Sequence, residues 1–528
     1  MSYGTLRKAR IFISLFFFLL ITFIFLDISN VFPTGFIRDI LYLQFVPSLI
    51  CFLGVISIGA AGFIVILLIT ILFGRIYCSF LCPLGTFQDV LIGLRSQFIW
   101  KGSAKKPQFR YRKPLNWIRY PILGINLLAF IPGYIIIINL FDPYSTYGKI
   151  ISKLLRPLYI GLHNGMTYFF ERFDIYNFHP VRLNGPVWTA FGFAILVLSI
   201  LIWMTFKKGR LYCNSVCPVG SLLALVSKIS IYRIHLDETK CTKCGRCAAV
   251  CKAGCIDIRK KNVDFSRCVG CLNCLTPCLD DAIHFAPVWT KIQNSGNVTD
   301  FDKRKFLKES ALLIGGTLLL PKIIKAQIEA PKEIIPGTAS VNRKIPVTPP
   351  GSIGLKHFNE KCTACYICVS QCPTQVLQPS LFQYGLKGLF QPRMDYIKSY
   401  CNYECKICGE ICPTGAINPM TLDEKKLTQL GQSKFVKEDC IVYTRKTDCG
   451  ACSEHCPTKA VNMVPYLEKL TIPEVDNTIC VGCGACEYAC PTDPKAIYVE
   501  GNPLHKTAEK PKTDQVQKKV DLKEQFPF

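Results

Sequence analysis

The sequence predicts a membrane-embedded α-helical bundle joined to small, cysteine-rich α+β domains. Three observations lead to this prediction. Half of the 528 residues are hydrophobic, and the mean hydropathy of +0.27 is high for a protein that lies wholly in water. Long apolar runs occur in the first half of the chain. Most of the 30 cysteines fall into tight groups of four, a pattern that indicates metal binding and not a disulfide scaffold.

Each apolar run has about the length that a helix needs to cross the hydrocarbon core of a bilayer, roughly 20 residues. The first run has a basic start at Arg7, Lys8 and Arg10, and no small-residue cleavage site follows it. We therefore expect a membrane anchor there and not a removable signal peptide. The expected four-span membrane domain covers residues 1–235, and its spans lie at about residues 11–26, 46–73, 118–141 and 187–206.

The loop charges predict how these spans are oriented. Between Lys101 and Arg119 the chain carries many basic residues and no acidic one, and Lys207, Lys208 and Arg210 follow the fourth run. Basic loops stay on the cytoplasmic side, so the segments after the second and fourth spans are expected there, in a bacterial inner membrane. The formal net charge of +25 is explained by these flanking residues, and we expect no nucleic-acid partner.

Residues 236–290 contain two runs with the spacing C-x2-C-x2-C-x3-C, as in "CTKCGRCAAVC". This spacing wraps a short loop around a [4Fe–4S] cluster, and the fourth cysteine of each run ligates the other cluster. Zinc sites favour two separated cysteine pairs, so zinc and disulfides are the weaker alternatives. The predicted ligand sets are Cys241, Cys244, Cys247 and Cys278 for one cluster, and Cys268, Cys271, Cys274 and Cys251 for the other.

Residues 362–500 contain four further runs, each ending in Cys-Pro, and predict a four-cluster ferredoxin-like domain. The outer two runs have regular spacing and the inner two are irregular, which favours nested pairing of first with fourth and second with third. Sequential pairing remains open. The ligands expected are Cys362, Cys365, Cys368 and Cys372; Cys401, Cys405, Cys408 and Cys412; Cys440, Cys449, Cys452 and Cys456; and Cys480, Cys483, Cys486 and Cys490.

A different motif is written twice, as "GRIYCSFLCPLG" at residues 74–85 and "GRLYCNSVCPVG" at residues 209–220. Cys-x-x-x-Cys-Pro is the terminal half of a ferredoxin run, so two copies brought together supply one four-thiolate site. Arg75 and Arg210 would offset the negative charge of its sulfurs. A redox-active dithiol pair, or cysteines that only pack, are the alternatives. The predicted metal or seventh cluster site consists of Cys78, Cys82, Cys213 and Cys217.

The segments between and after these domains are also distinctive. Residues 301–326 form an export-like or fifth hydrophobic segment, in which Lys303 stands where a twin-arginine signal has its first arginine. Residues 327–361 are linker-like, and residues 501–528 form a polar tail. The charge asymmetry favours crossing of the membrane at the export-like segment. The four-cluster domain is then periplasmic.

Several motifs are missing from the sequence. The four predicted spans contain no histidine, and no Cys-x-x-Cys-His occurs, so we expect no haem. No Gly-x-Gly-x-x-Gly follows a predicted strand, so we expect no nicotinamide cofactor. No catalytic acid, base or nucleophile constellation stands out. Cys51 and Cys255 have no assigned role.

Residues 1–290, with the paired "YCxxxCPxG" motifs, "FDPYSTYGKI" (residues 141–150) and two ferredoxin runs, resemble the NapH/MauN family of membrane polyferredoxins. Residues 302–500 resemble the NapG-type periplasmic ferredoxin, so the chain looks like a fusion of the two. The resemblance implies oxidation of the membrane quinol pool and electron delivery to a partner reductase or respiratory complex. A cytoplasmic donor is the other possible source of the electrons. The alternative function is a metal- or thiol-reducing factor that matures a respiratory metalloenzyme, because a related branch with the same paired motif serves oxidase assembly.

Overall fold

The computed structural model describes residues 3–54, 61–100, 109–176, 178–182, 185, 187–288, 343–467 and 469–511. It divides into two compact units. The helical unit comprises the described residues within 1–337, 356–392 and 407–419. The C-terminal unit comprises those within 338–355, 393–406 and 420–528. The predicted export-like segment, residues 301–326, lies outside the described residues.

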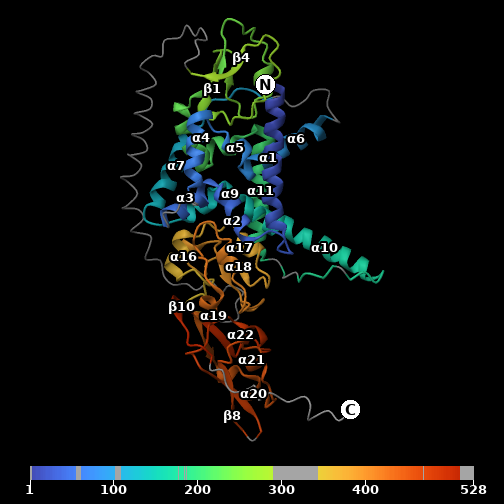
Figure 1. Ribbon diagram of the computed structural model, residues 1–528, viewed down its shortest axis with the longest axis vertical. Coiled ribbons are helices and arrows are strands. Elements are labelled where there is room, and N and C mark those ends of the chain that lie inside the picture. Colours follow the sequence, from blue (N-terminus) through green and yellow to red (C-terminus); the bar gives the residue numbers. More distant parts are fainter. Residues whose placement is uncertain are drawn as a thin grey trace. The chain divides into compact units, whose positions relative to one another are not determined.

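Two helices of the helical unit are long and apolar enough to cross a membrane, α1 (Tyr3–Leu26) and α11 (Trp188–Lys208) (Figure 1). They contain the first and fourth predicted spans. A third candidate exists if the pair α2 (Thr34–Tyr42) and α3 (Phe45–Gly54), which is bent by 102°, counts as one broken span. The apolar stretches of these helices lose little of their surface to the rest of the protein, as expected for helices that face lipid.

The third predicted span is not one continuous helix. It divides into α7 (Asn116–Phe130) and α8 (Ile136–Phe141). Between α7 and α8, Gly133 adopts a positive φ of 79° and follows Pro132, which has no amide proton to continue the helix. The expectation of one full-length helix is therefore corrected for this span. The second predicted span contains α3 and the 12-residue helix α4 (Gly62–Phe73), and residues 55–60 between them lie outside the described residues.

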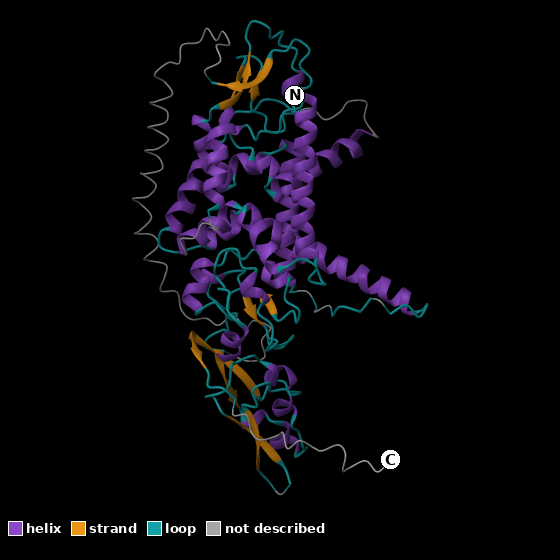
Figure 2. Ribbon diagram, in the orientation of Figure 1, coloured by secondary structure: helices purple, strands orange, loops and turns teal. Residues whose placement is uncertain are grey.

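The other helices of the helical unit pack around α1 and α11, and Figure 2 shows that helices dominate this part of the chain. Its core is apolar and aromatic and includes Phe25, Tyr144, Tyr147, Leu201 and Leu223. The remaining helices are α5 (Tyr77–Phe80), α6 (Pro83–Trp100), α9 (Pro143–Ile150), the π-helix η2 (Ile151–Leu155), α10 (Arg156–Glu171), α12 (Leu211–Ser215), α13 (Pro218–Val226) and the 3-10 helix η3 (Ser227–Ile229).

The two-run segment after α13 forms a small domain built on two short pairs of antiparallel strands. Strand β1 (Tyr232–Leu236) pairs antiparallel with β4 (Ile283–Pro287), so the segment begins and ends side by side. Strand β2 (Ile256–Asp257) pairs with β3 (Asn262–Val263) between the two runs. This layout brings the runs together as the crossed ligand sets require. The domain also contains α14 (Arg246–Ala249) and η4 (Phe265–Arg267).

Two cysteine-rich segments contact opposite ends of α1. Near its start, the Arg7 guanidinium donates to Thr276 Oγ1 at 3.5 Å, in the two-run domain. Near its end, Gln371 Nε2 donates to the Ile24 carbonyl at 2.6 Å, beside the first C-terminal run. At 1.5 Å per residue, about 25 Å of helix separates these contacts. The segment at the far end contains α16 (Leu355–Lys361), α17 (Ile367–Ser370), β5 (Leu377–Pro379), η5 (Leu386–Gly388) and α18 (Ile407–Glu410).

The C-terminal unit is built on two pairs of antiparallel strands. Strand β7 (Thr428–Phe435) pairs with β10 (Ile497–Thr507), with Phe435 opposite Ile497 and a bulge after Gly501. Strand β8 (Val461–Pro465) pairs with β9 (Thr471–Val475). The unit also contains the helices α19 (Leu422–Leu427), η6 (Lys437–Asp439), α20 (Ile441–Arg445), α21 (Ala451–Glu454) and α22 (Ala485–Ala489), and the strand β6 (Pro392–Met394) begins at its boundary.

Two boundaries in this region differ from those predicted from the sequence. Strand β10 continues through residue 507, so the first residues of the expected polar tail are part of a sheet. In the expected linker, the Arg343 guanidinium pairs with the buried Glu487 carboxylate, and the Ile345 amide donates to Glu500 Oε1 at 2.7 Å. These contacts are between residues far apart in sequence, which is why composition alone assigned both segments to irregular chain.

Candidate metal centres

Each copy of the paired motif begins where an apolar helix ends. Gly74 caps the C-terminus of α4 and Gly209 that of α11, and both glycines adopt positive φ values, 77° and 64°. Residues with a Cβ rarely adopt this conformation, so glycine allows the chain to turn sharply here. The turn directs the following arginine and cysteines back toward the protein interior and away from the helix axis.

The two arginines of the motif exchange partners between the copies. Arg75 of the first copy donates through Nη1 to the Gly220 carbonyl at 2.7 Å and to the Cys213 carbonyl at 3.4 Å, both in the second copy. Arg210 of the second copy donates through Nη1 to the Cys78 carbonyl at 2.9 Å in the first. Both side chains are fully buried. Because each copy supplies the donor that satisfies the other's backbone, neither copy is complete alone.

The glycine that ends each copy allows this close approach. A Cβ on Gly85 would lie 2.2 Å from the Cys78 carbonyl oxygen and 2.7 Å from Arg210 Nη1. A Cβ on Gly220 would lie 2.3 Å from the Cys213 carbonyl oxygen. Real Cβ atoms do not come this close to backbone atoms, so the motif requires glycine at both positions.

The four cysteines of the motif lie together and are buried. The thiols of Cys78, Cys82 and Cys213 all act on the pKa of Cys217, which burial raises well above its usual value. Burial raises the pKa of Cys78 to about 11, although Arg75 lowers it. Buried thiols in this state are protonated and unreactive unless a metal replaces the proton. The structure thus brings together all four residues of the predicted site.

Two further features favour negative charge on these sulfurs. Cys217 caps α13, and its Sγ accepts a hydrogen bond from the Gly220 amide at 3.3 Å. The Gly85 amide acts in the same way on Cys82 at the start of α6. Helix N-termini carry partial positive charge and lower the cost of a thiolate. In addition, Gln88 Nε2 donates to Cys213 Sγ at 3.4 Å.

Three fully buried arginines, Arg75, Arg119 and Arg210, surround this site. Arg210 pairs with Asp89 at 2.9 Å, and the same carboxylate also pairs with Arg10 and with Lys252, so its charge is shared among three cations. Buried cations are costly unless anions offset them. A cube held by four thiolates carries a net negative charge, so the surrounding charge fits an iron–sulfur centre at this position.

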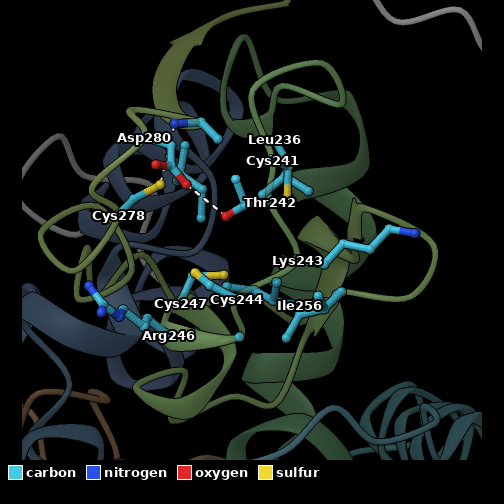
Figure 3. Close-up of a pocket in the computed structure, with 14 residues that line it drawn as sticks. Leu236, Cys241, Thr242, Lys243, Cys244, Arg246, Cys247, Ile256, Cys278 and Asp280 are labelled. Carbon is cyan, nitrogen blue, oxygen red and sulfur yellow. Dashed lines mark hydrogen bonds between the residues drawn. The ribbon is translucent and has the colours of Figure 1, made fainter.

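In the two-run domain, two cavities are lined by the crossed cysteine sets. One is lined by Cys241, Cys244, Cys247 and Cys278, as Figure 3 shows. Thr242 Oγ1 donates to Asp280 Oδ2 at 2.7 Å beside it, which joins the two runs. The other cavity is lined by the second set, and Cys255 lies in its wall as well. The fourth cysteine of each run thus crosses to the other cavity. The residues of that second set are Cys251, Cys268, Cys271 and Cys274.

The paired motif contacts the second of these cysteine sets directly. Arg75 Nε donates to the Cys268 carbonyl at 3.4 Å, and the neighbouring Ser79 hydroxyl donates to the Val269 carbonyl. Arg119 links the same two parts, since its Nη2 reaches the carbonyls of Gly220, at 3.4 Å, and Ser266, at 3.2 Å. One guanidinium therefore touches the backbone of a ligand in each of two adjacent candidate centres.

At the far end of α1, the cysteines Cys362, Cys365 and Cys368 lie near Cys412 of the next run. Burial raises the pKa of Cys365 to about 12, and the nearby Cys412 and Asp142 contribute to this rise. The set therefore takes its fourth member from the second C-terminal run.

The C-terminal unit shows the same exchange between the third and fourth runs. Burial raises the pKa of Cys486 well above its usual value, and Cys456 of the third run is among the thiols that add to the rise. Conversely, Cys490 acts on Cys452, whose pKa burial raises to about 12. Pairing is therefore sequential, first with second and third with fourth, and the nested pairing that the spacing favoured is wrong. Similar spacing reflects local loop length, whereas pairing is decided by which runs fold on one another.

The sequence interpretation missed the role of the segment "FDPYSTYGKI". Asp142 caps α9 by accepting from the Ser145 amide at 2.7 Å, and the Ser145 hydroxyl donates to the Thr363 carbonyl at 2.6 Å. A Cβ on Gly148 would lie 2.1 Å from the Cys365 carbonyl oxygen. Helix α9 thus forms the surface against which the first C-terminal run packs. The signal available in the sequence was the close spacing of Asp-Pro, Tyr, Gly and Lys in this segment. A single sequence does not show which other part of the chain such a segment contacts.

Among the described residues, no three His, Cys, Asp or Glu side chains form a group that could hold one metal ion. Four sulfurs around a tetrahedral zinc ion would each lie about 2.3 Å from the metal, and so close to one another. Thiolates that hold a cube are spread over its corners instead. The donor sets, all of sulfur and lining cavities, fit [4Fe–4S] clusters.

Family models for iron–sulfur domains match several parts of the chain. A 4Fe-4S binding domain model matches residues 55–101 and 189–235, which contain the two copies of the paired motif. Another 4Fe-4S binding domain model matches residues 234–257. Two 4Fe-4S dicluster domain models match residues 361–417 and 447–493, in agreement with sequential pairing of the C-terminal runs.

Two curated relatives are also named as ferredoxin-type proteins. The chain is 23% identical over 243 residues to the ferredoxin-type protein NapH of Escherichia coli, which is 44% of this chain and 70% of that protein. It is 26% identical over 199 residues to the methylamine utilization ferredoxin-type protein MauN of Methylorubrum extorquens, 38% of this chain and 54% of that protein. The chain is similar to the NapH/MauN-type polyferredoxins. It is an iron–sulfur, ferredoxin-type protein of electron transport. No solved structure matches it.

The close approach at the paired motif of the polyferredoxin gives a testable prediction. Gly85→Ala places a Cβ against the Cys78 carbonyl and should lower the stability by about 1–3 kcal/mol, because neither backbone nor the buried Arg210 has room to shift. The measurement is thermal unfolding of the purified protein in detergent.

Gly93→Ala is the matched control, since it lies on the same helix α6 with open space around it. Alanine in a helix is favoured over glycine by about 0.5–1 kcal/mol, so this variant should unfold at the same or a higher temperature. Equal unfolding temperatures for the two variants would contradict the close approach.

Proposed function

We propose that the chain is a membrane-bound electron-transfer protein that passes electrons from quinol through several [4Fe–4S] clusters to a partner reductase. The observation that carries this proposal is the Arg75 side chain, which touches the backbone of Cys213 and of Cys268 at once. Two cysteine sets joined by a single buried side chain lie close enough for clusters in them to exchange electrons. A purely structural role would not require that proximity.

The proposed ligands are the 24 cysteines of the six runs, with the crossing of the fourth cysteine described above. The paired motif supplies a seventh four-sulfur site. When bound, the clusters supply one-electron carriers. The protein's own residues hold them at fixed places, exclude water from most of the sulfurs, and offset their charge with buried arginines.

Helix α9 supports a path from the paired motif to the far end of α1. Asp142 lies within electrostatic reach of Tyr77 and Tyr212, the tyrosines that precede the cysteines of the two motif copies. The Tyr212 hydroxyl donates to the Phe141 carbonyl at 2.9 Å. On its other side, Asp142 acts on Cys365. One buried segment therefore touches both the paired motif and the first C-terminal run.

The Tyr144 side chain also supports a cluster at the first C-terminal run. Its hydroxyl is buried without a hydrogen-bond partner among the described residues and lies near Cys365, Cys412 and Cys368. A buried hydroxyl without a partner is costly, and a cluster sulfur in this set would accept its hydrogen bond. The site therefore fits an iron–sulfur cluster as its occupant.

A cavity next to this run has the character of a quinol site. It lies between the π-helix η2, α10, the start of α11 and α17, and its apolar wall includes Pro157, Ile160 and Phe191. Three of its polar atoms, Ser152 Oγ, Arg156 Nε and Ser370 Oγ, are buried without hydrogen-bond partners among the described residues. A quinol headgroup has a flat apolar ring and two polar oxygens, which match this lining. π-helical turns are frequent at functional sites.

Burial weighs against the alternative of a thiol-reducing maturation factor. Thiol exchange needs an accessible thiolate, whereas all four cysteines of the paired motif are buried, and burial raises the pKa values of Cys78, Cys82 and Cys217. We therefore assign these cysteines to a cluster and not to a dithiol.

The two ends of α1 predict that the cysteine-rich segments face opposite sides of the membrane. A reporter fused after Lys207 should act as cytoplasmic, and one fused after Lys510 as periplasmic, because the basic residues after α11 are retained inside. Alkaline phosphatase and a fluorescent protein are suitable reporters. Cytoplasmic behaviour at Lys510 would refute the sidedness and leave the cluster assignment standing.

The proposed quinol cavity is tested by Arg156→Leu, which removes a charged donor from its wall. Reduction of the clusters by quinol, followed by visible absorbance, should slow about tenfold or more, while reduction by dithionite stays unchanged. Arg172→Leu, at the exposed C-terminus of the same helix α10, is the control and should leave both rates unchanged. Equal slowing in the two variants would show that the cavity is not the quinol site.

Iron content tests the paired motif. Seven cubes hold about 28 iron atoms per chain, and Cys78→Ala/Cys213→Ala should retain about 24 after anaerobic purification. Cys51→Ser is the control, because this buried cysteine contacts Tyr42 at 3.7 Å and has no assigned role. Unchanged iron together with a reversible disulfide would favour a dithiol instead.

A further inference from the structure

A cysteine outside the predicted ligand sets lies inside one of the candidate cluster sites. Cys255 is buried, and its Sγ lies 3.5 Å from that of Cys251. On its other side it hydrogen-bonds to Cys268. It also lines the same cavity as these two ligands. This cavity therefore presents five thiols to a cluster that has four corners.

The sister site in the same domain shows what this position normally holds. Cys255 follows Cys251 by four residues, and Ala282 follows Cys278 by four. The two positions match in structure, because the Ala282 amide donates to Cys278 Sγ at 3.3 Å and the Cys255 amide likewise acts on Cys251. A thiol thus replaces a methyl group at a position that faces the cluster.

We propose that Cys255 is a reserve ligand of the cluster held by Cys251, Cys268, Cys271 and Cys274, and takes the place of Cys251 when that ligand is lost or released. In the exchange, the iron–sulfur bond to Cys251 breaks and a bond from iron to Cys255 forms. The Cys255 proton passes to Cys251 across the 3.5 Å contact, in which either sulfur can donate. No electron is gained or lost, so no further reagent is needed.

The backbone between the two cysteines also suits an exchange. In the C-terminal runs, a proline follows the fourth cysteine and fixes the local φ angle, whereas Lys252 follows Cys251. Lys252 connects the loop to the paired motif, because its carbonyl accepts from the Arg210 amide at 2.9 Å and its Nζ pairs with Asp89 at 3.1 Å. The exchange is therefore placed where the two-run domain meets the paired motif.

This inference rests on the proposed cluster binding, and the experiment separates the two. The full chain is purified anaerobically in detergent, and iron per chain and the electron paramagnetic resonance spectrum of the reduced protein are measured. Alanine variants are used because a serine oxygen can itself bind iron. Absence of iron from the unsubstituted protein would refute the proposed function and this inference together.

With iron present, Cys251→Ala should keep the full iron content and show an altered spectrum, since Cys255 completes the site. Cys278→Ala, whose neighbour is Ala282, is the matched control and should lose about four iron atoms. Cys251→Ala/Cys255→Ala should lose about the same number. Equal iron loss from Cys251→Ala and Cys278→Ala would overturn the proposal.

Placing an extra cysteine in the sister site tests whether iron loss from a variant is caused by misfolding. Cys278→Ala/Ala282→Cys should regain the iron that Cys278→Ala loses, because the new thiol stands where Cys255 stands in the other site. Cys255→Ala alone should keep its iron, held by Cys251. Iron loss from Cys255→Ala with none from Cys251→Ala would show that Cys255 is the resident ligand, and would overturn its assignment as the reserve.

Discussion

The exchange of Arg75 and Arg210 between the two copies of the paired motif is the contact on which the helical unit depends. Each guanidinium is fully buried and satisfies backbone carbonyls that belong to the other copy. Removing either arginine would leave buried carbonyls without donors, and moving the copies apart would leave two buried charges without partners. The apolar helices of this unit could pack in many ways, but this exchange is compatible with few of them. Helices α4 and α11 are held in register by it.

The same exchange makes the site electrostatically incomplete without an anion. Arg75, Arg119 and Arg210 gather around four buried thiols, and Asp89 is shared among Arg210, Arg10 and Lys252. Thiols in such surroundings stay protonated on their own, and metal binding releases the protons and supplies the negative charge. In the proposed function, cluster insertion and folding are coupled at this place, because the proposed ligands, the counter-charges and the helix packing are contributed by the same few residues.

Helix α9 extends this organisation across the unit. Asp142 and Gly148 connect the tyrosines of the paired motif to the backbone of Cys365, so two cysteine-rich regions at opposite ends of α1 share one buried element. Contacts of this kind fix distances between redox centres far better than flexible tethers do. Helix α9 is the surface against which the first C-terminal run packs.

The sequence alone determined the chemistry of the sites. Cysteine spacing specified the six runs and the crossing of Cys251 and Cys278, because a cube imposes a fixed short loop on any chain that wraps it. The repeated motif specified that Cys78, Cys82, Cys213 and Cys217 belong together. Hydropathy located α1 and α11, whose length is set by the bilayer.

Only the tertiary structure decided the long-range partners. The sequential pairing of the C-terminal runs, the role of α9 and the place of Cys255 all depend on contacts between residues distant in sequence. Local spacing carries no information on such contacts, since many chain paths bring the same ligands to the same distance. The physical reason is that a cluster constrains the loop around it strongly, whereas packing selects which loops meet.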